Sequence, residues 1–252
     1  MCVVWNGSMK KALAPHLRRL TRREALGALG ATSAALTLIN CGSSPTAADS
    51  TTTSTTTTTT GTTNAACAVS PTETIGPYPS IANFIRSDIR EGKTGVPVTL
   101  TITVVNASSN CSPVSGAIVD IWQCDADGHY SEYAQQGYNG TTQTFLRGIQ
   151  TTDASGIVTF TTIYPGWYAG RATHIHVEVT VNGKVVKVTQ IAFPESVTAA
   201  VYSSGVYATK GQNPTSNAGD MVFADSVSSE TAAISGSPSS GYTATFTVGV
   251  SM

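Results

Sequence analysis

Six short segments between residues 98 and 250 alternate apolar and polar residues, or run apolar, between turns of Gly, Asn and Ser. They span 98–105, 116–122, 156–162, 173–181, 184–193 and 242–250. A period of two is typical of half-buried β-strands. Asn182-Gly183 supplies the positive φ angles of a tight hairpin between two of these segments. Residues 67–252 are enough for one domain with a sizeable core, so we expect a single all-β domain there, a β-sandwich of mainly antiparallel strands.

Residues 1–41 have the pattern of an export signal. Arg22-Arg23 stands ahead of a modest apolar stretch, 27–39, as in signals of the twin-arginine (Tat) route. This uncharged stretch is shorter than the ~20 residues of a membrane-spanning helix. We therefore expect export across a bacterial inner membrane by the Tat route, to the periplasm or cell envelope. Translation starts at Met1 or at Met9, the more conventional of the two.

The end of this signal resembles a bacterial lipobox, in which a cysteine becomes the lipidated N-terminus after cleavage. The segment is Leu38-Ile39-Asn40-Cys41, and Asn40 departs from the small residue expected there. Two outcomes stay open: a membrane tether through a lipidated Cys41, or cleavage nearby and release. Residues 42–66 are nearly all Ser, Thr, Ala and Gly, which cannot bury a core, so we expect a disordered linker.

Charge and cysteine content narrow the function classes. Charged residues make up 12% of the chain and the formal net charge is −1, so no basic face for nucleic acid is expected and the partner should be a small molecule. Cys67, Cys111 and Cys124 remain in the expected domain. An exported protein meets an oxidising compartment, so one disulfide is expected among them, with its pairing open.

His174 and His176 lie two residues apart in one of the expected strands. Side chains at i and i+2 leave a strand on the same face, so the two imidazoles could bind one metal ion while Ile175 packs the other way. The other histidines are His16, inside the export signal, and His129. A histidine-rich metal site in the mature protein should therefore be built around His174 and His176, although paired histidines also occur by chance on exposed strands.

Four separated blocks around these histidines resemble the intradiol ring-cleaving dioxygenases. One block runs from Ala117 through Asp125-Ala126-Asp127-Gly128-His129 to Tyr130. The others are Phe145-Leu146-Arg147-Gly148, the stretch 151–156, and Tyr164-Pro165 followed by His174-Ile175-His176. The resemblance covers roughly residues 72–194, and it is closest to the protocatechuate dioxygenase-like branch.

The resemblance implies one non-haem Fe(III) ion per domain, held at one end of the sandwich on strand ends and loops. Its ligands would be two tyrosinates and two histidines: Tyr130, Tyr164, His174 and His176. Phenolate is a hard anionic donor that suits Fe(III), and neutral imidazole suits a borderline ion. A Cu or Zn site is an alternative, but two phenolates are an unusual set for either metal.

The resemblance also implies roles beside the metal. Arg171 would stabilise anionic charge on the substrate, Gln190 would orient pocket groups, and Tyr164 would take a substrate proton as it leaves the iron. A loop like that at residues 72–78 lines the approach to the metal in this family. The candidate substrate contacts are Gly76, Pro77, Tyr78, Trp167 and Tyr168.

The expected function follows from this resemblance. An intradiol dioxygenase chelates a catechol-type aromatic diol on Fe(III), inserts both atoms of O2 and cleaves the ring between the hydroxylated carbons to a muconate-type diacid. The alternatives are a non-catalytic exported β-sandwich module that binds ferric ion or catecholate compounds, and a structural lipoprotein without metal. The ring substituent and the oligomeric state stay open.

Overall fold

The computed structural model describes residues 67–252, so the expected export signal (1–41), the Cys41 lipobox and the linker (42–66) lie outside the described residues. The strands are β1 (Pro97–Asn106), β2 (Ser112–Pro113), β3 (Ile118–Trp122), β4 (Ala134–Gln135), β5 (Tyr138–Asn139), β6 (Arg147–Thr151), β7 (Ile157–Ile163), β8 (His174–Val181), β9 (Lys184–Ala192), β10 (Ala233–Ser237) and β11 (Gly241–Val250). The helices are α1 (Glu195–Tyr202) and α2 (Val227–Glu230), with 3-10 turns η2 (Ala107–Ser109), η3 (Gly205–Thr209) and η4 (Asn217–Gly219). Within residues 67–252, the helices are too short or too polar to span a membrane.

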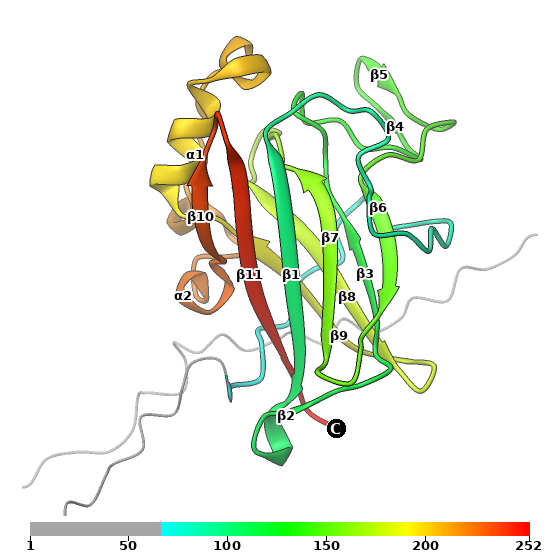
Figure 1. The fold of residues 1–252 in the computed structure, drawn as a ribbon. Coiled ribbons are helices and arrows are strands. Elements are labelled where there is room, and N and C mark those ends of the chain that lie inside the picture. Colours follow the sequence, from blue (N-terminus) through cyan, green and yellow to red (C-terminus); the bar gives the residue numbers. More distant parts are fainter. Residues whose placement is uncertain (1–66) are drawn as a thin grey trace, which may run out of the picture. The chain divides into compact units, whose positions relative to one another are not determined.

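The strands form two sheets and a small hairpin (Figure 1). One sheet has the order β10-β11-β1-β2, with β7 also paired to β1; the other has the order β6-β3-β8-β9. The first and last long strands, β1 and β11, pair in parallel, with Val98 opposite Tyr242. The remaining pairs of named strands are antiparallel. The expected all-β fold of mainly antiparallel strands is therefore confirmed.

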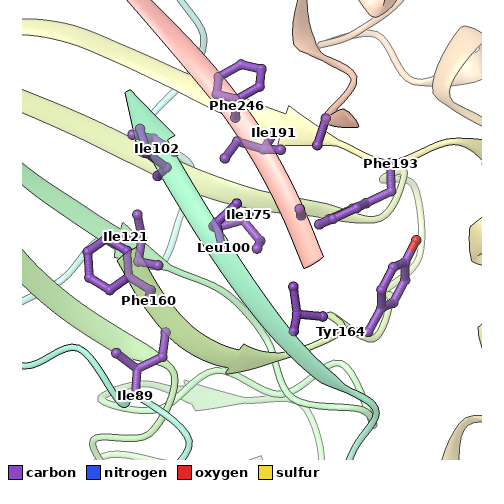
Figure 2. Close-up of a cluster of buried hydrophobic side chains, with 14 of the residues drawn as sticks. Ile89, Leu100, Ile102, Ile121, Phe160, Tyr164, Ile175, Ile191, Phe193 and Phe246 are labelled. Carbon is purple, nitrogen blue, oxygen red and sulfur yellow. The ribbon is translucent and has the colours of Figure 1, made fainter. Parts of the chain in front are cut away.

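The core lies between the two sheets. Alternate residues of β1 point into it, and Leu100 and Ile102 have no exposed surface. Ile121 and Ile175 enter from the other sheet, and the four side chains join one hydrophobic cluster (Figure 2). Burying an aliphatic side chain of this size stabilises the fold by roughly 1.5–3 kcal/mol. This packing fixes which face of β8 looks inward and which looks away from the core.

Two local sequence features take the expected form. Asn182 and Gly183 have φ angles of 51° and 74°, and they connect β8 to β9 as a hairpin. Cys67 and Cys111 form a disulfide, and Cys124 is a free, buried thiol. The expected single disulfide is thus present, and the pairing left open by the sequence is Cys67 with Cys111.

Candidate metal centre

The two histidines of β8 lie on the face opposite the core. Ile175, between them, belongs to the main hydrophobic cluster. The imidazoles of His174 and His176 are buried, and their Nε2 atoms are 3.1 Å apart. The Nδ1 atom of His174 is 2.6 Å from the carbonyl oxygen of Ala172, which can only accept, so Nδ1 carries the proton and Nε2 presents its lone pair to His176. Two ring nitrogens thus converge on one point.

Two tyrosines complete the group. The hydroxyl of Tyr168, from the loop between β7 and β8, is 3.2 Å from Nε2 of His174. Tyr130, from the loop after β3, has its ring centroid 5.8 Å from that of Tyr168 and 6.3 Å from that of His176. The Tyr130 hydroxyl is buried without a hydrogen-bond partner. We call Tyr130, Tyr168, His174 and His176 the His–Tyr cluster.

His176 is held between an indole and a glycine. Trp122 lies directly opposite His176 in the β3–β8 ladder, and the two rings stack with centroids 5.0 Å apart and an angle of 4°. On Gly76, an added Cβ atom would lie 2.8 Å from Cε1 of His176, and its φ angle of 77° also favours glycine. The Nδ1 atom of His176 has no hydrogen-bond partner. Packing on both faces and the contact of Nε2 with His174 therefore fix this ring, while its Nδ1 side has no partner.

Tyr164 does not join this group, which corrects the expected ligand set. Its hydroxyl is 2.7 Å from Oγ1 of Thr198 on α1, and its ring lies 4.7 Å from that of Phe193 within the core (Figure 2). Tyr164 directly follows β7, whose Val158 and Phe160 face the core. At the end of the strand Ile163 and Tyr164 both pack into the same hydrophobic cluster. The second tyrosine beside the histidines is Tyr168, which the sequence predicts as a substrate contact.

Burial sets the protonation of the cluster. It is the largest cause that lowers the pKa of His174 to about 3 and the pKa of His176 well below its usual range. Burial also raises the pKa of Tyr168 to about 12 and the pKa of Tyr130 well above its usual value. Neutral imidazoles are the form that binds metal ions, and a bound metal ion provides the charge that lets a phenol ionise. The cluster therefore suits a cation.

Arg171 and Gln190 lie together beside the cluster. The guanidinium Nη2 of Arg171 donates to Oε1 of Gln190 at 2.5 Å, and Nε2 of Gln190 donates to the carbonyl of Thr74 at 2.8 Å. Gln190 also lies opposite His176 in the β8–β9 ladder. Arg171 contributes to the lowered pKa of His174, so its charge acts on the cluster. The two residues expected beside the metal are thus brought together with the 72–78 segment.

The remaining predicted contact residues divide into two places. Tyr78 packs on the cluster, with its ring centroid 4.9 Å from that of Tyr130, and Gly76 and Pro77 precede it in the chain. Trp167 lies elsewhere: its Nε1 donates to the carbonyl of Gly211 at 2.9 Å, and its ring packs on the main core. Tyr78 therefore remains a candidate substrate wall, whereas Trp167 supports the loop that carries Tyr168.

Asp125, Asp127 and His129 form a second group of ligand-type side chains within 4.8 Å of one another. The Asp125 carboxylate is already used, because it pairs with Nζ of Lys93 at 2.6 Å and accepts the backbone N–H groups of Asp127 and His129. This is an Asx-type turn that shapes the loop leading to Tyr130. We therefore assign it a structural role.

Comparisons with known proteins identify the family of this chain. A family model described as Dioxygenase matches residues 79–213. An intradiol ring-cleavage dioxygenase from Tetranychus urticae is 31% identical, with 73% of this chain and 95% of that chain covered and a TM-score of 0.68. The dioxygenase domain of a carbohydrate-binding fusion protein from Streptomyces sp. SirexAA-E is 28% identical, with 73% and 99% covered and a TM-score of 0.55.

Similarity to a more distant solved structure supports the fold alone. Hydroxyquinol 1,2-dioxygenase from Pseudomonas putida DLL-E4 is 17% identical, with 73% of this chain and 66% of that chain covered and a TM-score of 0.53. A search of curated proteins found no match. The family match and the 31% identical relative, taken with the His–Tyr cluster, lead to one conclusion: this chain belongs to the intradiol ring-cleavage dioxygenases.

Proposed function

We propose that this protein is an Fe(III)-dependent dioxygenase that cleaves a catechol-type diol between its hydroxylated carbons, giving a muconate-type diacid. The observation that carries the proposal is the convergence of two phenols and two imidazoles in the His–Tyr cluster. Tyr130, Tyr168, His174 and His176 would hold the iron, with Tyr168 in place of Tyr164. This set keeps the two-tyrosine, two-histidine composition that the family resemblance implies.

The donor set fits ferric iron. Phenolates are hard anionic ligands, and two of them offset two of the three positive charges of Fe(III). Nδ1 of His174 is held by the Ala172 carbonyl, the usual way in which a ligand imidazole is oriented. The unpaired, buried Tyr130 hydroxyl would gain in the metal the partner that the protein does not give it.

The residues around the cluster support diol chemistry. A bound ferric ion would act as a Lewis acid that chelates the diol and prepares its ring for reaction with dioxygen. Arg171, beside the cluster, would stabilise the negative charge of the deprotonated diol. Tyr78 would form an aromatic wall on the side of Tyr130, and burial of the cluster excludes bulk water.

The first test is the visible absorption of the purified, iron-analysed protein, before and after a catechol is added without oxygen. We expect a tyrosinate-to-Fe(III) charge-transfer band that shifts to longer wavelength with the diol, and then oxygen uptake across a catechol panel. Stoichiometric iron without colour would overturn the ligand set. Colour and a catechol shift without oxygen uptake would instead favour a module that binds ferric ion or catecholates.

We also propose that the chain is exported by the Tat route. The disulfide between Cys67 and Cys111 supports an oxidising compartment. The test is cell fractionation of the wild type and of a variant in which Arg22 and Arg23 are both lysine. Retention of the variant precursor in the cytoplasm is expected, and equal export of both proteins would contradict the proposal. A Cys41→Ser variant then distinguishes a lipid tether from release.

A further inference from the structure

Arg171 is held by the carboxylate of Asp220. This residue is not among the expected site residues, and it lies outside the segment that the family model matches. Nε of Arg171 donates to both oxygens of Asp220, at 3.1 and 2.9 Å. Asp220 is buried, and its 1% exposure leaves the pair little contact with water. It follows η4 and lies beyond residues 79–213, the part of the chain that the family model matches. A buried ion pair thus joins the C-terminal part of the chain to the site.

Asp220 is fixed independently of Arg171. Its Oδ2 accepts the backbone N–H of Ala172 at 2.6 Å, and its Oδ1 accepts the N–H of Val222 at 2.8 Å. The N–H of Asp220 itself bonds to the carbonyl of Asn217, which closes the η4 turn. These bonds to backbone groups fix the position of the Asp220 carboxylate without any side-chain partner. Asp220 therefore acts as a preformed anchor for the guanidinium.

The anchor sets the orientation of Arg171. With Nε on Asp220 and Nη2 on Oε1 of Gln190, two of the three nitrogens of the planar guanidinium are held. Nη1 bonds to no protein acceptor within residues 67–252, so its donors are free for a ligand. The Arg171 charge contributes to the lowered pKa of His174 and of His176. Gln190 lies opposite His176 in the β8–β9 ladder, so the guanidinium bound to it lies beside the cluster.

We propose that Asp220 is a positioning residue for the ring-cleavage reaction: it holds Arg171 so that the free Nη1 donors serve the anionic diol. This inference rests on the proposed function, since it assigns Arg171 to a substrate charge. Asp220 would not touch the diol. Its effect on the reaction would pass through Arg171. In a protein that lacks Arg171, replacing Asp220 should therefore change the activity little.

The kinetic test uses the full chain and four variants: D220N, D225N, R171A and the double variant D220N/R171A. Asparagine loses the charge and keeps a carbonyl oxygen for only one of the two backbone N–H groups, that of Ala172 or that of Val222. D225N makes the same change at an exposed position of this segment. We expect D220N to lower kcat/KM by about 10–100-fold, mainly through kcat, as for residues that orient active-site groups. D225N should match the wild type, and D220N should add less than about twofold in the R171A background.

Two results would overturn the proposal. One is a wild-type kcat/KM in D220N when R171A is impaired. The other is the full D220N loss persisting in the R171A background, which would mean that Asp220 acts through the Ala172 backbone instead.

Crystal structures of the wild type and D220N separate this inference from the proposed function. We expect one ordered Arg171 side chain in the wild type and a displaced or multiple one in D220N. An unchanged Arg171 in D220N would refute the positioning role, whatever the activity. If the wild type cleaves no catechol, the proposed function fails, and the two structures still decide whether Asp220 positions Arg171.

Discussion

Tyr164 and Tyr168 stand four residues apart on one loop, and both are largely buried, yet their surroundings differ in kind. In the core, the three most deeply buried tyrosines each have a protein partner for the hydroxyl: Tyr164 pairs with Thr198, Tyr202 with Thr173, and Tyr207 with a backbone carbonyl. In the His–Tyr cluster, the Tyr130 hydroxyl and Nδ1 of His176 have none. The core pairs these tyrosine hydroxyls within the protein, whereas the His–Tyr cluster leaves two buried polar atoms without a partner.

This difference in hydrogen bonding distinguishes tyrosines that stabilise the fold from tyrosines that bind a ligand. Leaving a buried polar group unpaired costs about 1–3 kcal/mol, so folding alone favours partners such as Thr198. An unpaired, buried phenol beside two converging imidazole nitrogens is explained by a ligand that they bind. A buried tyrosine is therefore best judged by whether its hydroxyl is already used.

The largest expected effect comes from removing the hydroxyl group of each of these two tyrosines in turn. Tyr168→Phe should remove a metal ligand, so we expect loss or displacement of the charge-transfer band and a fall in kcat larger than the roughly 10–100-fold typical of residues outside the ligand set. Tyr164→Phe removes only the bond to Thr198 and should cost about 1–3 kcal/mol of unfolding free energy. Visible spectra, oxygen uptake and urea unfolding of both variants check this.

The reverse result would break the comparison. A normal spectrum in Tyr168→Phe, together with a bleached Tyr164→Phe, would restore Tyr164 as the ligand that the sequence first suggested.

Gly76→Ala tests how tightly the cluster is held. The new Cβ atom would lie 2.8 Å from Cε1 of His176, so we expect a displaced imidazole, a weakened band and about 10–100-fold lower kcat/KM. Gly183→Ala is the matched control, because Gly183 has a similar φ angle of 74° with open space around it. Both variants should lose about 1–2 kcal/mol of stability from the left-handed backbone. Equal activity in the two would show that His176 tolerates the added atom.

Removing the disulfide should lower the stability of the fold and leave the His–Tyr cluster intact. Replacing Cys67 and Cys111 with serine frees a loop with a sequence separation of 44 residues and should cost about 2–4 kcal/mol of unfolding free energy. The visible band and kcat, measured well below the unfolding temperature, should match the wild type. Loss of the band in folded protein would mean that the cluster depends on this distant link.

The smallest effect concerns pH. Burial, followed by the opposing Glu178, raises the pKa of Asp120 to about 7. The folded state therefore holds a proton that the unfolded state has released. The stability from this difference is complete below the ordinary carboxyl pKa, near pH 4, and is lost as pH rises through about 7.

Asp120→Asn removes this titration. Between pH 5 and pH 7 we expect the unfolding free energy to fall less steeply in the variant than in the wild type, by up to about 1.4 kcal/mol per pH unit. Urea unfolding across that range checks it, with D225N as the exposed control. Parallel pH profiles for wild type and Asp120→Asn would refute the assignment.

Much of the frame could be predicted because it depends on local patterns. The alternation over 98–105 became β1, Asn182-Gly183 became a hairpin, and the spacing of His174 and His176 placed both imidazoles on one face. The position of Tyr164 did not follow from alternation, because Ile163 and Tyr164 are neighbours and both pack into the core.

Other parts depend on contacts between distant segments. Asp220 reaches Arg171 across 49 residues, and neither residue carries a local signal of the pair. Trp122 meets His176 only because β3 pairs with β8 in one register. The partner of Cys67 was likewise open, because three cysteines give no rule for choosing two. Such links follow from tertiary structure, which no local pattern in the chain encodes.

The parallel pairing of β1 with β11 has a consequence for biosynthesis. β11 is an inner strand, between β10 and β1, yet it follows every other described strand along the chain. The sheet therefore cannot close during synthesis until β11 has been made, and long-range pairing of this kind folds slowly. A product cut short before β11 would leave β1 with an open edge. Such a product would expose unpaired backbone groups and be a substrate for cellular proteases.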